Sequence, residues 1–368
     1  MDGSPVRSPQ AGEASGAARI GGGERLALAS ILTRVHEMER QVTVTKTLIE
    51  GVMAGSSQVD ELVTGTAVQT VPRWHFAMLN DIERNDAFAK ALEQVVEPGS
   101  HVLDIGSGTG LLAIMAVRAG AEKVTTCEVN PILAEIAREI VKRHGMAGVI
   151  SVIGKRSTDL QVGVDLDPAD LVISEIVDCG LIGEGLLPTV RHARIHLLRP
   201  GGKLLPSHAR LFGALLDSPV VANLNSVGTS AGLDLRPFNV VATQRHFPVR
   251  LSTWPHRLLS RPAELISFDL VRDPLQDGRA EVELPVTSTG HAHGLVAWFE
   301  MELCAGVLLR NSPDGAGSHW MQAYLPFPSP VPVRAGQSLG LAVGWRDEKL
   351  FAEVATDRPV PINMEENR

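Results

Sequence analysis

Two glutamates follow a short apolar segment and bound a single loop. Glu175 and Glu184 stand nine positions apart in the run Ser174–Gly185, which also contains three glycines. A pair of carboxylates suits a guanidinium, because that cation is planar, stays charged at physiological pH and offers its donors in a fork. We therefore predict that these side chains hold a guanidino group. Two solvated loop carboxylates are the alternative interpretation.

A glycine-rich turn forms the second chemical pattern. Val102–Gly110 is typical of a strand followed by a turn that opens a helix. Gly106, Gly108 and Gly110 have the spacing GxGxG, whereas GxGxxG is the spacing that receives a dinucleotide pyrophosphate. S-adenosyl-L-methionine, which has no phosphate and has a cationic amino-acid end, fits this turn better than NAD. A tight turn without a ligand is the alternative.

Two acidic residues accompany the glycine turn. Asp104 stands just before the glycines, and Glu128 ends the next predicted strand, 22 positions after Gly106. At that spacing a carboxylate commonly binds the ribose hydroxyls of a nucleotide cofactor. The sequence therefore predicts cofactor contacts at Asp104, Gly106, Gly108, Gly110 and Glu128.

The elements that must position these residues alternate between apolar runs and helical patterns. The predicted strands are His101–Ile105, Lys123–Glu128, Val149–Ile153 and Leu171–Ser174, and the predicted helices are Leu111–Arg118 and Pro131–His144. This alternation predicts a parallel sheet with helices on its faces, and ligands bind at the carboxyl ends of such strands. Another helix is predicted to begin at Pro72.

The pattern changes after Pro206. Short alternating runs, such as Ala263–Leu270, Leu295–Leu303 and Ser338–Trp345, stand between glycine and proline turns. They predict an antiparallel β-barrel. The fold class expected is therefore α/β, with a Rossmann-like domain followed by an antiparallel β-barrel. Its parts are a disordered tail (1–23), a helical segment (24–71), the cofactor domain (72–206) and the barrel (207–368), which includes a candidate dimerisation arm (219–245).

Composition and charge exclude several classes of protein. The formal net charge is −8 and no long basic run is present, so nucleic acid is not an expected partner. Neither a stretch of ~20 apolar residues nor an N-terminal leader is visible, which predicts a cytoplasmic protein without a membrane contact. Cys127, Cys179 and Cys304 are far apart and lack CxxC spacing, so we expect no disulfide and no metal site.

Three further motifs carry a resemblance to a known family. Leu79–Asn85 (LNDIERN), Pro200–Pro206 (PGGKLLP) and Ser318–Gln322 (SHWMQ), taken with the two-glutamate loop, resemble the protein arginine N-methyltransferase family. The resemblance covers about Trp74 to Trp345. It implies an S-adenosyl-L-methionine-dependent enzyme that methylates the guanidino group of arginine.

The resemblance also implies roles for individual residues. Glu175 and Glu184 are expected to be catalytic, with His319 and Asp81 as a pair that takes part in proton loss. Arg84 is expected to hold the cofactor's carboxylate, and Arg156 and Ser157 to lie beside the adenine. Asp178, Trp320 and Met78 are expected to contact the substrate.

The chain departs from the family in its tyrosines. The family carries tyrosines on the helix before the cofactor domain, whereas Tyr324 is the single tyrosine here. Trp74 or His75 can replace those hydroxyl contacts only in part. Asp178 and the run Leu181–Gly185 resemble the monomethylating, type III branch, which implies N-omega-monomethylarginine as the product.

The resemblance leaves the acceptor as a choice between two forms of arginine. We expect free L-arginine, in bacterial antibiotic biosynthesis, with an arginine-containing peptide or protein as the alternative, and we expect a homodimer. Two rival hypotheses remain open. One is an inactive cofactor-binding interaction module, and the other is a methyltransferase for another small amine.

Overall fold

The computed structural model describes residues 22–54, 65, 68, 70–315 and 318–355, and the chain divides into two compact units, Met1–Thr70 and Val71–Arg368. All but the last two residues of the predicted tail lie outside the described residues. The first unit contains α1 (Gly22–Met53), whose apolar residues Leu28, Ile31 and Val35 are exposed. No described helix is both long and apolar enough to cross a membrane.

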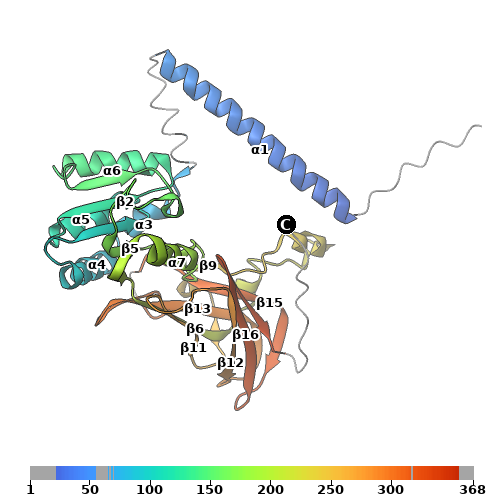
Figure 1. Cartoon of the computed structure of the whole chain (residues 1–368). Coiled ribbons are helices and arrows are strands. Elements are labelled where there is room, and N and C mark those ends of the chain that lie inside the picture. Colours follow the sequence, from blue (N-terminus) through green and yellow to red (C-terminus); the bar gives the residue numbers. More distant parts are fainter. Residues whose placement is uncertain (1–21, 55–64, 66–67, 69, 316–317, 356–368) are drawn as a thin grey trace, which may run out of the picture. The chain divides into compact units, whose positions relative to one another are not determined.

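A five-stranded parallel sheet begins the second unit (Figure 1). Its strands lie in the order β3-β2-β1-β4-β5. The bounds are β1 His101–Ile105, β2 Lys123–Cys127, β3 Ile150–Ile153, β4 Ala169–Ser174 and β5 Leu198–Leu205. The helices are α3 Trp74–Leu79, α4 Ile82–Val95, α5 Leu111–Arg118, α6 Pro131–Arg143 and α7 Leu186–His196, with a short 3-10 turn at Ser157–Asp159. The Rossmann-like half of the predicted fold is confirmed.

The strand register brings three predicted residues to one edge of this sheet. Ile105, the last residue of β1, pairs with Cys127 of β2 and with Ser174 of β4. The residue that follows each strand, Gly106, Glu128 or Glu175, therefore stands at the same level. Because neighbouring strands are about 4.8 Å apart, the two carboxyl-bearing positions flank the glycine turn at a separation of roughly 10 Å. The order reverses at β1, where α/β sheets bind ligands.

The single helix predicted from Pro72 is instead two helices, α3 and α4. Between them Asp81 has an extended backbone (φ −77°, ψ 98°) and its side chain accepts a hydrogen bond from the Arg84 backbone N–H. Aspartate is a strong N-cap because its oxygen satisfies an otherwise unpaired N–H of the first turn. The break therefore sets Met78 and Arg84 on separate helices.

Antiparallel sheets form the rest of the second unit, as predicted after Pro206 (Figure 1). One has seven strands, and a three-stranded sheet β12-β16-β17 packs near it. The larger strands are β6 His208–Asp217, β11 Ala263–Asp269, β12 Gly278–Pro285, β13 Gly290–Cys304, β15 Gln322–Val333, β16 Ser338–Arg346 and β17 Lys349–Val354. The shorter ones are β9 Phe247–Val249, β10 Arg257–Leu258 and β14 Val307–Arg310. Apolar residues of both halves of the unit, such as Leu103 and Leu295, belong to one continuous core.

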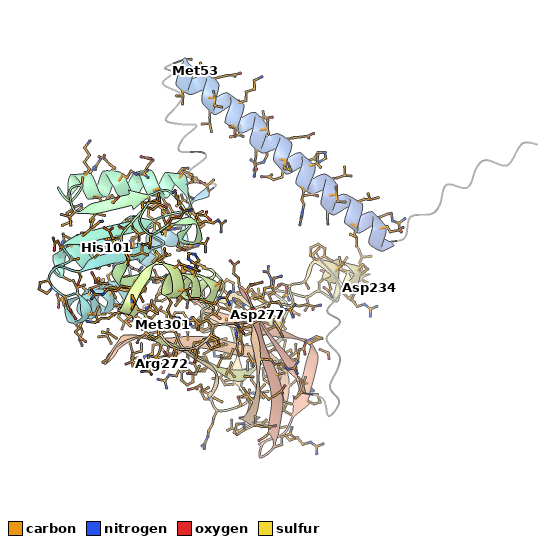
Figure 2. The ribbon with its side chains drawn as sticks, viewed as in Figure 1. Met53, His101, Asp234, Arg272, Asp277 and Met301 are labelled. Carbon is orange, nitrogen blue, oxygen red and sulfur yellow. The ribbon has the colours of Figure 1, made fainter. Side chains whose placement is uncertain are left out.

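The candidate arm is built of short elements between β6 and β9. It contains α8 (Pro219–Ala222), the hairpin β7 (Thr229–Ser230) and β8 (Leu233–Asp234), and a 3-10 helix η2 (Arg236–Val241). Asp234 lies where this segment extends away from the large sheet (Figure 2). Two asparagines join segments of the arm outside its strands, because the side-chain amide of Asn225 exchanges two hydrogen bonds with the backbone of Thr243 and that of Asn239 exchanges two with the backbone of Val227.

Candidate active site

A cavity of about 390 Å³ opens at the carboxyl edge of the parallel sheet. Its wall is formed by the loops after β1, β2, β3 and β4 and by α3. Of the residues predicted to bind or to react, it includes Met78, Arg84, Gly106, Gly108, Glu128, Arg156, Ser157, Glu175 and Glu184. Residues from five separate segments of the chain are thus gathered around one space.

The glycine turn brings backbone close to this cavity. Gly106, Gly108 and Gly110 have φ values of +85°, +51° and +77°, which side-chain-bearing residues rarely adopt. At Gly106 a Cβ atom would stand 2.8 Å from the Cγ2 atom of Ile176. Glycine is therefore required at Gly106 both by its backbone conformation and by the close packing of the Glu175–Glu184 loop.

Glu128 presents a carboxylate at the cavity wall. One oxygen accepts the Gly108 N–H at 3.0 Å and the other accepts the Asn130 N–H at 2.8 Å. The carboxylate is thus fixed between the glycine turn and the start of α6, where Asn130 is the N-cap. A fixed acceptor at this position suits a pair of ribose hydroxyl donors.

Arg84 and Glu175 form an ion pair in the floor of the cavity. Nη2 of Arg84 donates to Oε2 of Glu175, and both side chains are almost fully buried. Burial raises the pKa of Glu175 above its ordinary value, and the guanidinium of Arg84 opposes that rise. The Nε atom of Arg84 is buried without a partner within the described residues. It is therefore a donor left over for a carboxylate-bearing ligand.

Glu184 carries a carboxylate of different character. Burial of the carboxylate raises its pKa to about 7, and the negative charges of Glu175, Asp178 and Glu348 contribute to that rise. The residue as a whole is exposed towards the cavity, so water moderates this effect. Because its proton is held near neutral pH, Glu184 can exchange a proton with a bound cation.

The loop between the two glutamates is held by Asp178. One oxygen of Asp178 accepts the N–H groups of Gly180 and Gly183 at 3.0 and 2.9 Å. Leu181 has a φ of +76° and is fully buried. This strained, closed loop fixes the distance in space between Glu175 and Glu184. Asp178 was predicted to contact the substrate, but it holds the loop and is not among the cavity-lining residues.

Asp81 and His319 are in contact, as the resemblance implied. Oδ2 of Asp81 accepts both the backbone N–H of His319 and its ring Nδ1, each at 2.8 Å. Burial opposes the charge of Asp81, yet hydrogen bonds from Arg84 and His319 leave its pKa lowered. Burial also lowers the pKa of His319. Neither residue lines the cavity, and the part of this pair in proton loss stays a prediction.

Three other predicted residues lie behind the wall rather than on it. Asp104 is buried, accepts a hydrogen bond from the Thr126 hydroxyl at 2.8 Å, and has a pKa raised by burial to about 6. Gly110 is the N-cap of α5. Trp320 donates its ring N–H to the Val177 carbonyl at 3.0 Å. All three therefore support the turn or the loop from beneath.

The sequence prediction omitted several residues that line the cavity. Lys155 and Thr158 flank the predicted Arg156 and Ser157 in the loop after β3, and their position after a predicted strand could have found them. Trp74 and His75, named above as partial replacements for the family's tyrosines, also line the cavity. Their rings stack with centroids 3.9 Å apart, and Nδ1 of His75 contacts the Pro72 carbonyl.

Comparisons with known proteins place this site in a family. Residues 218–350 match the arginine methyltransferase oligomerization subdomain, and residues 88–204 match ribosomal protein L11 methyltransferase. An arginine N(omega)-methyltransferase of Streptomyces achromogenes subsp. streptozoticus is 55% identical over 289 residues, which are 78% of this chain and 80% of that protein. The chain belongs to the arginine N-methyltransferase family. The predicted family, and with it the predicted class of enzyme, is confirmed.

More distant members differ in length. Protein arginine N-methyltransferase 1.6 of Arabidopsis thaliana is 36% identical over 243 residues. The matched region is 61% of this chain but only 34% of that longer protein. Among solved structures, the Trypanosoma brucei PRMT1 enzyme-prozyme heterotetrameric complex with AdoHcy has a TM-score of 0.67 at 26% identity, covering 79% of this chain and 95% of that one. Its two-part fold matches the one described above.

Proposed function

We propose that this chain transfers the methyl group of S-adenosyl-L-methionine to a guanidino nitrogen of free L-arginine and releases N-omega-monomethylarginine. The observation that carries this proposal is one cavity whose wall holds Glu128 and the glycine turn together with Glu175 and Glu184. Glu128 and the glycine turn fit a nucleoside, and the two glutamates fit a guanidinium. Similarity to the Streptomyces arginine N(omega)-methyltransferase supports the choice of arginine.

The residues on the wall fit the cofactor. Glu128 would accept the ribose hydroxyls, the unpartnered Nε of Arg84 would face the cofactor's carboxylate, and Arg156 and Ser157 would adjoin the adenine. When bound, S-adenosyl-L-methionine supplies a methyl group on a positively charged sulfur. The chain's own contribution is to hold the acceptor nitrogen in line with that group and to exclude competing orientations.

The two glutamates divide the work on the acceptor. Glu175, fixed by Arg84, orients the guanidinium through charge-assisted hydrogen bonds. Glu184 accepts the proton that the reacting nitrogen must lose, because its pKa of about 7 matches the pH at which the proton is transferred. Fixed carboxylates also stabilise the positive charge that passes to the guanidino group. We assign the role of proton acceptor to Glu184 rather than to His319 and Asp81, because these two residues do not line the cavity.

Competition between acceptors tests the substrate. Free L-arginine, a Gly-Arg-Gly peptide and a basic protein are compared by kcat/KM, with products identified by mass spectrometry. We expect free L-arginine to be preferred and only the monomethylated product to accumulate. A tenfold preference for peptide or protein, about 1.4 kcal/mol of discrimination, would favour a protein arginine methyltransferase. Cofactor binding without methyl transfer to any acceptor would favour an inactive interaction module. Methyl transfer to another small amine, and not to arginine, would favour a methyltransferase for that amine.

We further propose a homodimer formed through the arm. The arm exposes Leu233, Leu235, Phe238, Val240 and Val241, an apolar surface that a partner copy would cover. Phe238→Glu is expected to convert a dimer to a monomer in light scattering at micromolar concentration. Val164→Asp, at an exposed apolar residue outside the arm, should leave the dimer intact. A fully active wild-type monomer would contradict this proposal.

The cellular setting follows from the same proposal. We place the protein in the bacterial cytoplasm, where its three free cysteines, Cys127, Cys179 and Cys304, stay reduced. We also propose a role in antibiotic biosynthesis, as the resemblance described in the sequence analysis implies.

A further inference from the structure

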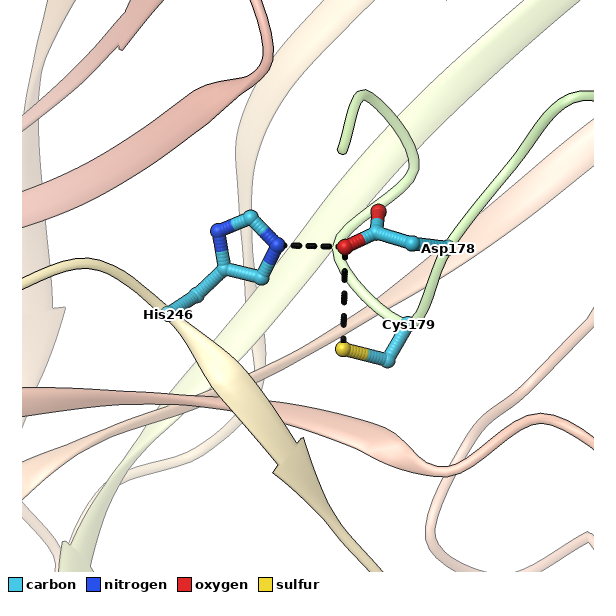
Figure 3. A group of neighbouring side chains, drawn as sticks. All are labelled: Asp178, Cys179 and His246. Atoms are coloured by element: carbon cyan, nitrogen blue, oxygen red, sulfur yellow. Dashed lines mark hydrogen bonds and ion pairs between the residues drawn. The ribbon is translucent and has the colours of Figure 1, made fainter. Parts of the chain in front are cut away.

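His246 contacts the loop that carries both glutamates, although it comes from a distant part of the chain. Its Nε2 lies 2.5 Å from Oδ2 of Asp178, and its side chain is 7% exposed (Figure 3). The other oxygen of Asp178 already accepts the N–H groups of Gly180 and Gly183. The carboxylate of Asp178 thus joins the backbone of the loop to one ring nitrogen of His246.

Two glycines of the loop pack tightly against the side chains of His246 and Asp178. A Cβ at Gly180 would stand 2.7 Å from the ring of His246, and a Cβ at Gly183 would stand 2.1 Å from Asp178. Both glycines are therefore needed for the histidine and the aspartate to reach each other. The loop also bonds elsewhere to the barrel, since Asn311 donates to the Cys179 carbonyl at 3.1 Å.

On its other side, His246 stands at the base of the arm. The side-chain amide of Asn225 exchanges hydrogen bonds of 2.7 and 2.9 Å with the backbone of Thr243, which stands three positions before His246. The His246 N–H then donates to the Leu350 carbonyl at 3.1 Å, and β9 begins at the next residue. The histidine is therefore anchored on both sides by backbone.

We infer that His246 is a positioning residue, which holds the segment 176–183 through Asp178 and so links the spacing of Glu175 and Glu184 to the base of the arm. This inference rests on the proposed function, because it assigns the two glutamates to catalysis. Displacing catalytic groups by about 1 Å can lower a rate by a hundredfold. A displacement at the base of the arm would therefore move Glu175 and Glu184 through His246 and Asp178.

A metal ion is the competing interpretation of the same group. Asp178, Cys179 and His246 each offer a ligand atom, and these atoms lie within 4.8 Å of one another. However, the oxygen and nitrogen that a metal would need are already joined by a short hydrogen bond. Burial and the neighbouring Asp178 also raise the pKa of the Cys179 thiol, which favours the protonated form over the thiolate that metals bind.

Two amide variants separate positioning from packing. The amide nitrogen of Gln reaches the place of a histidine Nε2, whereas that of Asn matches Nδ1. We expect His246→Asn to lower kcat at least tenfold, and His246→Gln to stay within threefold of wild type. The dissociation constant for S-adenosylhomocysteine should stay within twofold in both. His293→Asn is the matched control, because that barrel histidine lies 3.4 Å from Asp217 and away from the loop.

Hydrogen exchange measures the loop without relying on activity. Amides of 176–183 should exchange at least tenfold faster in His246→Asn than in wild type and in His293→Asn, with His246→Gln restoring protection. Equal activity of the Asn and wild-type proteins, equal loss in Asn and Gln, or unchanged loop exchange would each overturn the inference. So would one equivalent of zinc that is lost in Cys179→Ala. If wild type methylates no guanidine, the proposed function fails, while the exchange result still decides the positioning role.

Discussion

Glu175→Gln and Glu184→Gln should each bind S-adenosylhomocysteine with near-wild-type affinity and lose methyl transfer by a hundredfold or more. The amide keeps the shape of the side chain but removes the charge that orients and stabilises a guanidinium. A loss of that size corresponds to about 3 kcal/mol of transition-state stabilisation. Calorimetry gives the affinity, and kcat/KM with the preferred acceptor gives the rate.

The matched control is Glu93→Gln, an exposed glutamate on α4 away from the cavity. It should leave both quantities unchanged. The loss of methyl transfer should be larger in Glu175→Gln than in Glu184→Gln, because the amide at position 175 also leaves the buried guanidinium of Arg84 without its charged partner. Activity within threefold of wild type in either variant would remove that carboxylate from the mechanism.

The pH dependence of Glu184 supplies a second readout of the same prediction. Its pKa of about 7 means that Glu184 is neutral below pH 7 and ionised above it. Only the ionised form attracts a guanidinium and accepts its proton, so kcat/KM should rise through pH 7 and then level off. Glu184→Gln should lack this inflection. Asp104, with a pKa of about 6, is present in both proteins and so cannot account for the difference.

The contribution of Glu184 to protein stability should fall with rising pH, whereas its contribution to activity rises. A glutamate whose pKa is higher in the folded than in the unfolded protein binds its proton more tightly when folded. Its contribution to stability is therefore lost as pH rises from the ordinary value near 4.5 towards about 7. Glu184→Gln should melt at an equal or higher temperature than wild type at pH 8. A lower melting temperature there would mean that Glu184 stabilises the fold in its charged form.

The sheet was predictable because its strands have strong local patterns. The predicted strand His101–Ile105 coincides with β1, and the Glu128 and Glu175 positions follow from where neighbouring strands end. Parallel register then brings those ends together without any further information. The break at Asp81 was also visible in principle, since an aspartate before an apolar helix is a common N-cap signal.

The contacts that define the chemistry were not predictable in this way. Arg84 pairs with Glu175, 91 positions away, and His246 reaches Asp178 across 68 positions. The first contact is made within the Rossmann-like half and the second between that half and the barrel, and no local spacing encodes either of them. Glu128 is on the cavity wall because it follows its strand, whereas Asp104 lies within β1 and is buried behind the wall.

Glu128→Ala should weaken binding of S-adenosylmethionine and S-adenosylhomocysteine about a hundredfold. The reason is that Glu128 is the acidic side chain at the cavity wall beside the glycine turn, where two ribose hydroxyls would donate to it. Hydrogen bonds to a charged group contribute roughly 1.5–3 kcal/mol each, so losing both accounts for a change of at least this size. Calorimetry with purified protein measures it directly.

Two variants separate the loss of the ribose contact from damage to the turn. Glu128 also accepts the Gly108 and Asn130 N–H groups, so the Ala variant leaves both without their partner. Glu128→Gln keeps one acceptor oxygen but loses the charge and places an NH2 group opposite the other N–H, so we expect about tenfold weaker binding and a melting temperature between those of Glu128→Ala and wild type. Glu139→Ala, at an exposed ion pair with Arg143 on α6, is the matched control. Wild-type affinity in Glu128→Ala would show that the ribose is held elsewhere. Equal losses in Ala and Gln would show that charge, rather than the geometry of the turn, sets the affinity.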